Sequence, residues 1–213
     1  MSYKIILPLL FCIVLLSTSC SKENPPVPTP STISKEFIPL TFGHKYVYQR
    51  VHIPTDNISP RSYDTITISI QKDTLVNGNS YLKYVSSERY MENQLIRKEG
   101  NNYFSLWYFE RYMATTETLF FKEHLTKGEQ WETTSHGNKI LYSVTDKRDT
   151  LLLGTLYKNV VMIRGDIYFE EKPWLTTYHG YAEGIGEIYN FKPSPESRRY
   201  VDVELNLLKH SQE

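Results

Sequence analysis

Residues 63–72 read YDTITISIQK, and this stretch decides the fold class. Isoleucine occupies every second position, at Ile66, Ile68 and Ile70, with threonine or serine between. Because successive side chains of a strand point to opposite faces of a sheet, this alternation predicts a half-buried antiparallel strand. Residues 200–208, YVDVELNLL, alternate valine and leucine with polar side chains and predict a second such strand.

Shorter versions of this pattern run through the chain between those two segments. They predict further strands at 45–52, 80–86, 94–98, 103–109, 117–122, 140–145, 157–164, 176–181 and 187–191. Residues 103–109 and 157–164 are apolar on both faces, so we expect both sheet faces to be covered there. Turn sequences such as Asn77-Gly78 separate the strands. Residues 87–98 could instead form a short helix.

The composition agrees with an all-β fold. The chain has 213 residues, which fits one domain or two small ones, and 17 of them are tyrosine. We therefore expect an antiparallel, strongly curved sheet with few or no helices, and closure toward a barrel stays open. The 24 basic and 24 acidic side chains cancel. A nucleic-acid partner is excluded because it needs a concentrated positive field.

The N-terminus reads as an export signal. Lys4 precedes an apolar run at 5–16, and small residues at 17–19 lead to Cys20. The run is too short for a spanning helix, which needs about 20 residues. Small residues before a cysteine resemble the lipobox of bacterial lipoproteins, although Ser17 stands where leucine is usual. The resemblance implies a signal peptide at 1–19 and lipid on Cys20; a plain cleaved signal or an uncleaved anchor are the alternatives.

Residues 20–36 form the lipidated cysteine and a tether that contains four prolines. A proline-rich segment stays extended at roughly 3.1 Å per residue, so the folded part could stand up to about 50 Å from a bilayer. The other cysteine, Cys12, lies in the signal, so the mature chain would have no thiol for a disulfide or a metal. We expect a single domain at 37–209, a tail at 210–213, and attachment to the outer membrane on its periplasmic face or at the cell surface.

Two segments of the chain resemble each other. Residues 72–85 read KDTLVNGNSYLKYV and residues 148–161 read RDTLLLGTLYKNVV, identical at six of fourteen positions. Each predicts a strand, a glycine turn and a returning strand. A duplication and a convergence on shared turn chemistry both remain open.

Several segments, in order, resemble a broad group of uncharacterised Bacteroidetes lipoproteins. They are PLTFGHKYVY at 39–48, DTLVNG at 73–78, ETLFF at 117–121, GEQW at 128–131, GTLYKNV at 154–160 and YAEGIGEIY at 181–189. Tyr46 stands where tryptophan is more usual, and Glu129 where aspartate is. The resemblance implies an exported antiparallel β domain and supplies no catalytic residue.

The motifs of catalysis and metal binding are missing. No pair of the six histidines has i, i+2 or i, i+4 spacing, so we predict no metal site and no cofactor. Asp166, Glu170 and Glu171 could supply the paired carboxylates of a glycosidase. Neighbouring strand residues point to opposite faces, however, so we expect Glu170 and Glu171 in a solvated loop. A hydrolase is therefore the least favoured function, and no catalytic residue is predicted.

Aromatic side chains give the remaining candidate site. Aromatic platforms bind sugar rings and other flat apolar faces, although strands also use aromatic residues for packing. The candidate ligand-binding residues are Trp107, Trp131, Trp174, Tyr178 and Tyr181. We expect an envelope lipoprotein that binds a glycan, a lipid or a protein partner on a concave aromatic face. The alternative is a structural or assembly lipoprotein that docks onto another envelope protein.

Overall fold

The computed structural model describes residues 36–54, 58–88, 93–109, 112–113, 116–193 and 202–212. Within these ranges the chain forms strands and turns and no helix, which confirms the all-β prediction. The strands are β1 (His44–Ile53), β2 (Ser62–Val76), β3 (Asn79–Ser86), β4 (Asn93–Glu99), β5 (Asn102–Phe109), β6 (Tyr112–Met113) and β7 (Thr118–Lys122). They continue as β8 (Gln130–Ser135), β9 (Asn138–Leu152), β10 (Thr155–Phe169), β11 (Lys172–Ala182), β12 (Gly186–Lys192) and β13 (Asp202–Gln212).

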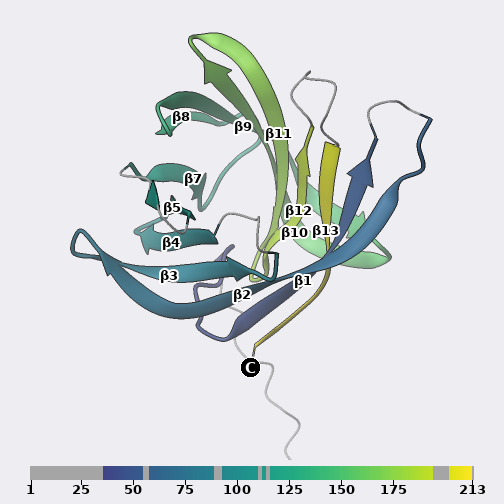
Figure 1. The fold of residues 1–213 in the computed structure, drawn as a ribbon, viewed down its shortest axis with the longest axis horizontal. Helices are drawn as coiled ribbons and strands as arrows, with labels where there is room; N and C mark the ends of the chain where they lie inside the picture. Colours follow the sequence, from purple (N-terminus) through teal and green to yellow (C-terminus); the bar gives the residue numbers. More distant parts are fainter. Residues whose placement is uncertain are drawn as a thin grey trace, which may run out of the picture. The chain divides into compact units, whose positions relative to one another are not determined.

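These strands form one antiparallel sheet of strong curvature (Figure 1). Neighbours in the sequence are neighbours in the sheet, except that β1 pairs with β13 and β7 pairs with β5. The β1–β13 ladder runs from the pair His44 and Gln212 to the pair Ile53 and Asp202. The first and last strands are thereby joined in the middle of the sheet.

The two ends of this series meet at β7 and β8, and side chains hold them together. The Thr118 hydroxyl donates to the Thr134 carbonyl at 3.2 Å, and the Leu119 N–H donates to the Thr133 hydroxyl at 3.1 Å. The indole N–H of Trp131 donates to the Leu119 carbonyl at 3.0 Å. The sheet is therefore nearly closed and barrel-shaped, with these side-chain bonds in place of a backbone ladder.

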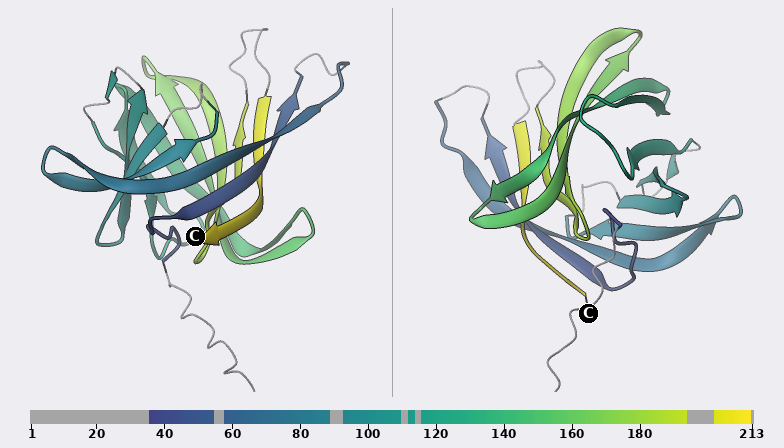
Figure 2. Two further views of the ribbon diagram at one scale, coloured as in Figure 1. Left: turned by 60° about the horizontal axis from the view of Figure 1, so that its bottom comes forward. Right: turned by 180° about the vertical axis from the view of Figure 1, so that it is seen from behind.

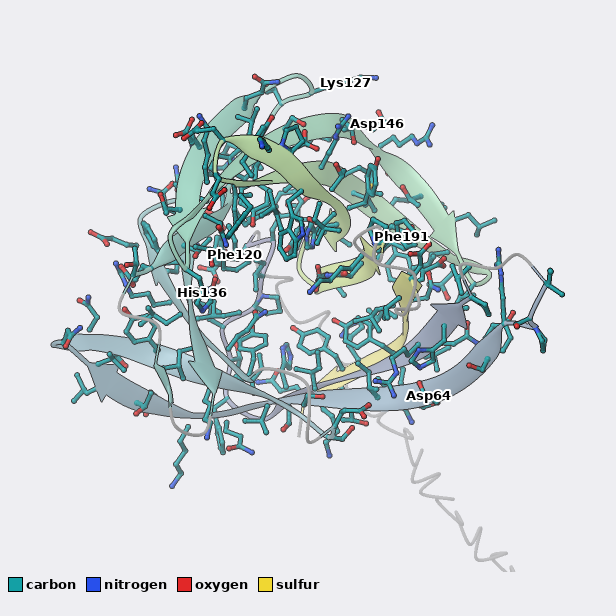
Figure 3. The ribbon with its side chains drawn as sticks, turned by 45° about the horizontal axis from the view of Figure 1, so that its top comes forward. Asp64, Phe120, Lys127, His136, Asp146 and Phe191 are labelled. Carbon is teal, nitrogen blue, oxygen red and sulfur yellow. The ribbon has the colours of Figure 1, made fainter. Side chains whose placement is uncertain are left out.

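The inner face of the sheet carries an apolar core, and the first described residues enter it. Phe37 is 5% exposed, and its ring lies 5.4 Å from that of Phe121. The ammonium group of Lys98 binds Glu36 at 2.8 Å and Glu123 at 3.0 Å. Figure 3 shows the many side chains that fill this space. The segment at the end of the predicted tether is thus fixed to the barrel by packing and by charge.

The structure corrects the sequence prediction at two places. Residues 93–99 form β4, so the helix considered for 87–98 is wrong over the described part of that range. Residues 130–135 form β8, which the alternation did not predict. The expectation of burial on both faces is confirmed in β10, where the neighbouring residues Val160 and Val161 are both fully buried.

The two similar segments form two similar hairpins. Their turn residues have nearly the same conformation, with φ of 49° and 82° at Asn77-Gly78 and 47° and 82° at Leu153-Gly154. The three residue pairs next to each turn have the same register. The ladders then diverge, because their bulges fall on opposite strands of the two hairpins. The hairpin prediction is confirmed, and duplication and convergence both remain compatible with it.

Candidate functional site

Two of the predicted aromatic residues are part of the core. Trp131 is 6% exposed, and its ring stacks on Tyr142 at 5.1 Å between centroids. Tyr181 is also 6% exposed and lies 4.6 Å from the ring of Phe121. Both side chains project from the inner face of the sheet. They stabilise the barrel and are not available as an exposed binding platform.

Two others lie on the outer face of β11. Trp174 is 52% exposed and Tyr178 is 36% exposed, and Tyr178 stacks on Phe191 at 6.2 Å. Trp107 pairs with Gln94 through its backbone, and its side chain lies outside the described residues. Among the four candidate side chains that the structure describes, two are inside and two outside. The structure therefore does not bring them together on one surface.

The inner face instead carries a polar cluster on β11 and β12, which we name the Glu187 cluster: Thr177, His179, Glu187 and Asn190. The carboxylate Oε1 of Glu187 lies 2.8 Å from Nδ1 of His179 and accepts a hydrogen bond from the Asn190 amide at 3.0 Å. Nε2 of His179 lies 3.0 Å from the Thr177 hydroxyl. The side chains of His179 and Glu187 are 19% and 27% exposed, so solvent reaches part of this cluster.

These contacts fix the tautomer of a neutral His179. A carboxylate only accepts hydrogen bonds, so Nδ1 must carry the proton that points to Glu187. Nε2 is then an acceptor for the Thr177 hydroxyl. The Asn190 amide nitrogen, 3.1 Å from Nδ1, donates to the carboxylate and not to the ring. The cluster is thus an ordered chain from hydroxyl to imidazole to carboxylate.

Buried tyrosines surround the Glu187 cluster. The Tyr48 hydroxyl donates to the backbone carbonyl of Glu187 at 2.8 Å. Burial raises the pKa of Tyr181 well above its usual range, and the carboxylate of Glu187 raises it further. The pKa of Tyr142 is raised by burial first and by Glu187 second. These phenols are neutral donors at any physiological pH.

Two further tyrosine hydroxyls on the inner face have no partner among the described residues. The hydroxyls of Tyr46 and Tyr84 are buried and make no hydrogen bond there. Burial raises the pKa of both hydroxyls. Tyr46 also raises the pKa of Tyr84, and both residues raise the pKa of the neighbouring Tyr48. A buried hydroxyl without a partner destabilises a fold by about 1–3 kcal/mol. Native proteins seldom leave such groups unpaired, and bound water or a ligand usually satisfies them.

A second polar group lies on the inner face at β1 and β2, separated from the Glu187 cluster by the buried Leu205. One row of directly opposed residues crosses six strands: Ile163, His179, Asn190, Leu205, Arg50 and Asp64. At its far end Arg50 binds Asp64, with Nε 2.8 Å from Oδ1, and also pairs with Glu88. The hydrogen bond from Arg50 lowers the pKa of Asp64. Figure 3 labels Asp64 at this side of the sheet.

The order hydroxyl, imidazole, carboxylate is also that of a catalytic triad, but the hydroxyl here is enclosed. Thr177 is 8% exposed and its hydroxyl also contacts the Gly165 carbonyl at 3.4 Å. A side-chain atom added at Gly165 would lie 2.9 Å from that hydroxyl and 2.8 Å from Tyr142. A nucleophile needs space for the carbonyl that it attacks. The arrangement therefore positions His179 and does not present a nucleophile.

The candidate carboxylates of a glycosidase are also accounted for. Asp166 accepts hydrogen bonds from Arg164 at 2.9 Å and from the Thr176 hydroxyl at 2.6 Å on the outer face. Glu170 and Glu171 form the exposed turn between β10 and β11, with φ of 47° and 62°. The sequence expectation of a solvated loop is confirmed there. No two of these three carboxylates face each other across a shared site.

The described residues contain no group of three or more histidine, cysteine, aspartate or glutamate side chains that could hold a metal ion. In the same part of the chain, no helix has the length and apolar character needed to cross a membrane.

Comparison with known proteins gives two distant structural likenesses. No protein-family model matches the chain, and no curated protein does. A candidate exported protein with a YmcC-like fold from Bacteroides fragilis is similar over 84% of this chain and all of its own, at 8% identity and a TM-score of 0.48. A candidate lipoprotein from Parabacteroides distasonis is similar over 83% of this chain and 99% of its own, at 9% identity and a TM-score of 0.39. Neither likeness is close enough to carry a function over.

Sequence reasoning missed the Glu187 cluster, although one signal was present. Strands were predicted at 176–181 and 187–191 on either side of a glycine turn, so His179 and Glu187 could be expected to face each other approximately. The ladder shifts by one residue between Gly180 and Tyr181, however. Such a bulge decides which side chains meet, and the alternation pattern does not reveal it.

Proposed function

We propose that this chain is a lipoprotein of the bacterial cell envelope, anchored through Cys20, which binds a small hydroxyl-rich ligand on the inner face of its sheet. The observation that carries this proposal is the pair of buried, unpartnered hydroxyls of Tyr46 and Tyr84 on the face that also holds the Glu187 cluster. The ligand class that fits is a glycan unit or a similar polar molecule that presents several hydroxyl groups.

Physical chemistry favours such a ligand. The buried hydroxyls of Tyr46 and Tyr84 can each donate and accept a hydrogen bond, and a ligand with several hydroxyl groups can supply both partners. Glu187 and Asn190 add an acceptor and a donor that are already oriented by neighbours. Because these groups are positioned before binding, little conformational entropy is lost when a ligand arrives.

Native mass spectrometry of the purified chain tests the ligand directly. We expect a stoichiometric additional mass that leaves on denaturation, and its fragmentation identifies the ligand class. Tyr84→Phe should weaken that complex while leaving the free protein unchanged or more stable, because it removes an unpaired hydroxyl. Tyr103→Phe is the matched control, since its hydroxyl donates to Glu123 at 2.8 Å and its loss should destabilise the protein without affecting the ligand. Either a bare mass or, where a complex is found, equal ligand binding by both variants would contradict the proposal.

The anchor has its own test. The proposal expects lipid on Cys20 and recovery of the chain with outer membranes. Cys20→Ser should release the chain from the membrane fraction, and the mass of the N-terminal peptide should lose the acyl chains. Protease accessibility in intact cells then distinguishes the periplasmic face from the cell surface.

A second candidate function is docking onto another envelope protein. The observation in its favour is the exposed pair Trp174 and Tyr178 on the outer face, because exposed aromatic side chains are enriched at protein interfaces. Cross-linking in cells, compared with a Trp174→Ala variant, tests it. Loss of a specific adduct in the variant would support docking over ligand binding.

A further inference from the structure

The hairpin of β9 and β10 ends in a cluster of exposed leucines, which we name the leucine tip: Leu151, Leu153 and Leu156. Their exposed fractions are 69%, 52% and 55%. Leu151 and Leu156 face each other directly across the ladder, and Leu153 is the first residue of the turn. Single exposed leucines are common on protein surfaces, but three on one turn make a contiguous apolar patch.

The similar β2–β3 hairpin shows that the turn forms without leucine at the position of Leu153. In the similar β2–β3 hairpin the turn is Asn77-Gly78, and asparagine is, after glycine, among the residues that best tolerate this left-handed conformation. Leu153 occupies the same conformation with φ of 47°. Leu75, which corresponds to Leu151, is also exposed, at 75%, but Ser80 stands at the position that corresponds to Leu156. Folding alone therefore does not explain why Leu153 and Leu156 are apolar.

The base of the hairpin is held firmly. Tyr157 is 6% exposed and Val160 is fully buried, and both pack in the core cluster that contains Leu207. Lys158 and Arg148 flank the tip with side chains 71% and 72% exposed, and they also bind Asp149 and Asp146 respectively. The tip is thus an apolar end on a packed base, with two exposed ion pairs beside it.

The tip lies at the end of the sheet where the tether joins the domain. The backbone carbonyl of Glu36 accepts a hydrogen bond from the N–H of Gly184, in the turn between β11 and β12. Glu183 in that turn accepts a hydrogen bond from the Asn159 amide of β10 at 2.6 Å. The first described residue of the chain and the base of the hairpin therefore meet at one turn.

From this turn the hairpin extends outward. The β10–β11 ladder ends at the pair Val161 and Tyr181, so residues 155–160 continue past it. At about 3.3 Å per residue this places the tip roughly 20 Å beyond the turn. Figure 2 shows the hairpin projecting past its neighbours. The tether, with a reach of about 50 Å, is long enough for Cys20 and the tip to touch one bilayer together.

We infer that the leucine tip inserts into the interface of the bilayer that carries the lipid anchor, and so fixes the orientation of the domain on the membrane. This inference rests on the proposed function, because the anchor supplies the bilayer. Leucine side chains enter the boundary between headgroups and acyl chains, and neighbouring lysine and arginine side chains remain at the headgroups. The occupant is a lipid surface, and a second copy of the chain or a protein partner is an alternative outcome of the test.

The test compares two labelled positions on the full chain reconstituted into vesicles of phosphatidylethanolamine and phosphatidylglycerol. Leu153→Cys carries an environment-sensitive fluorophore at the tip. Phe169→Cys carries the same fluorophore at the opposite end of β10, where the native side chain is 53% exposed, much as at the tip. We expect blue-shifted emission and several-fold stronger quenching by spin-labelled lipid at 153 than at 169. Equal quenching at both positions, or protection at 153 that depends on protein concentration and not on lipid, would overturn the inference.

Failure of the anchor is detected separately. A lipidated Cys20 has no free thiol, so the unsubstituted mature chain should not take up the maleimide fluorophore. If it does, the anchoring proposal fails. The two labelled variants are then made in a Cys12→Ser, Cys20→Ser background and added to the vesicles from solution. Stronger quenching at 153 would still support the leucine tip, and its absence would reject it.

Discussion

His179 on β11 and Glu187 on β12 meet diagonally across the ladder, with Nδ1 of the imidazole 2.8 Å from Oε1 of the carboxylate. The same carboxylate oxygen accepts a hydrogen bond from the Asn190 amide at 3.0 Å. A bulge in the β11–β12 ladder allows this contact, because it turns Glu187 to the face that carries His179. The inner face of the barrel thereby gains a carboxylate that His179 and Asn190 hold in place, and Tyr48 binds the backbone carbonyl of the same residue.

Two substitutions of Glu187 distinguish the contribution of its hydrogen bonds from that of its size. Glu187→Leu leaves the donors of His179 and Asn190 without their acceptor, so we expect a loss of about 1–3 kcal/mol in the free energy of unfolding. Glu187→Gln keeps one acceptor oxygen and should lose about 0.5–1.5 kcal/mol. Urea unfolding followed by tyrosine fluorescence measures both. Equal stability of the two variants would show that the hydrogen bonds in the Glu187 cluster are not what stabilises this region.

Lowering the pH should destabilise the outer face of the sheet, because it protonates Glu117. Arg97 binds its two carboxylate oxygens at 2.5 and 2.7 Å, and the Tyr81 hydroxyl donates to it as well. The hydrogen bond from Arg97 lowers the pKa of Glu117 below its ordinary value of 4.5. A lowered pKa in the folded state means that the stabilisation is complete above that ordinary value and is lost as the pH falls through the folded pKa.

Glu117→Gln should therefore be less stable than the native chain by about 1–2 kcal/mol at neutral pH. The difference should narrow as the pH is lowered below 4.5. Thermal unfolding across that pH range measures it. Glu132→Gln is the control, because its partner Lys139 and its own side chain are 40% and 58% exposed, and such surface pairs contribute little. A pH-independent difference between native and Glu117→Gln would contradict the assignment.

The β10–β11 turn stores backbone strain. Glu170 and Glu171 both have positive φ, which a side chain with a Cβ atom adopts at an energetic cost. Replacing them with the asparagine and glycine that this turn type prefers should stabilise the chain by about 1–2 kcal/mol. His136→Asn is a milder control, since Gly137 already occupies the second position of its turn. If the double variant does not gain melting temperature, the turn is open in solution and the two glutamates carry no strain there.

Alternation predicted most of the sheet, and its failures have physical reasons. In β2 the isoleucines mark the inner face clearly. In β8, QWETTS, the inner positions are Trp131, Thr133 and Ser135, and two of these use hydroxyls for hydrogen bonds or turn contacts. Because these inner positions are polar, the sequence of β8 does not alternate between apolar and polar residues. A strand that closes a barrel through side-chain bonds does not need an apolar face, so hydrophobic pattern could not reveal it.

The candidate site was less predictable because exposure depends on neighbouring strands. Trp131 and Tyr181 are on inward positions, whereas Trp174 and Tyr178 are on outward ones. Trp174 falls at a shift in the β10–β11 ladder between Ile167 and Tyr168, and β11 contains a second shift at Gly180. Residue spacing alone does not report such shifts. The sequence could identify the aromatic residues but not the side of the sheet on which each would lie.

Gly165 has no room for a side chain, which gives the last prediction. A Cβ atom there would lie 2.8 Å from the Tyr142 ring and 2.9 Å from the Thr177 hydroxyl. Both neighbours are buried and held by their own contacts, so Gly165→Ala should destabilise the chain by about 1–3 kcal/mol and displace Thr177 from His179. Gly180→Ala is the matched control on β11, because its two nearest contacts, Met162 Sδ at 3.1 Å and Tyr189 Cβ at 3.2 Å, are longer than those at Gly165. We expect a smaller loss there in urea unfolding. If Gly165→Ala were as stable as Gly180→Ala, the ring of Tyr142 would have to be mobile, and the Thr177 hydroxyl would then have the space that a reacting group requires.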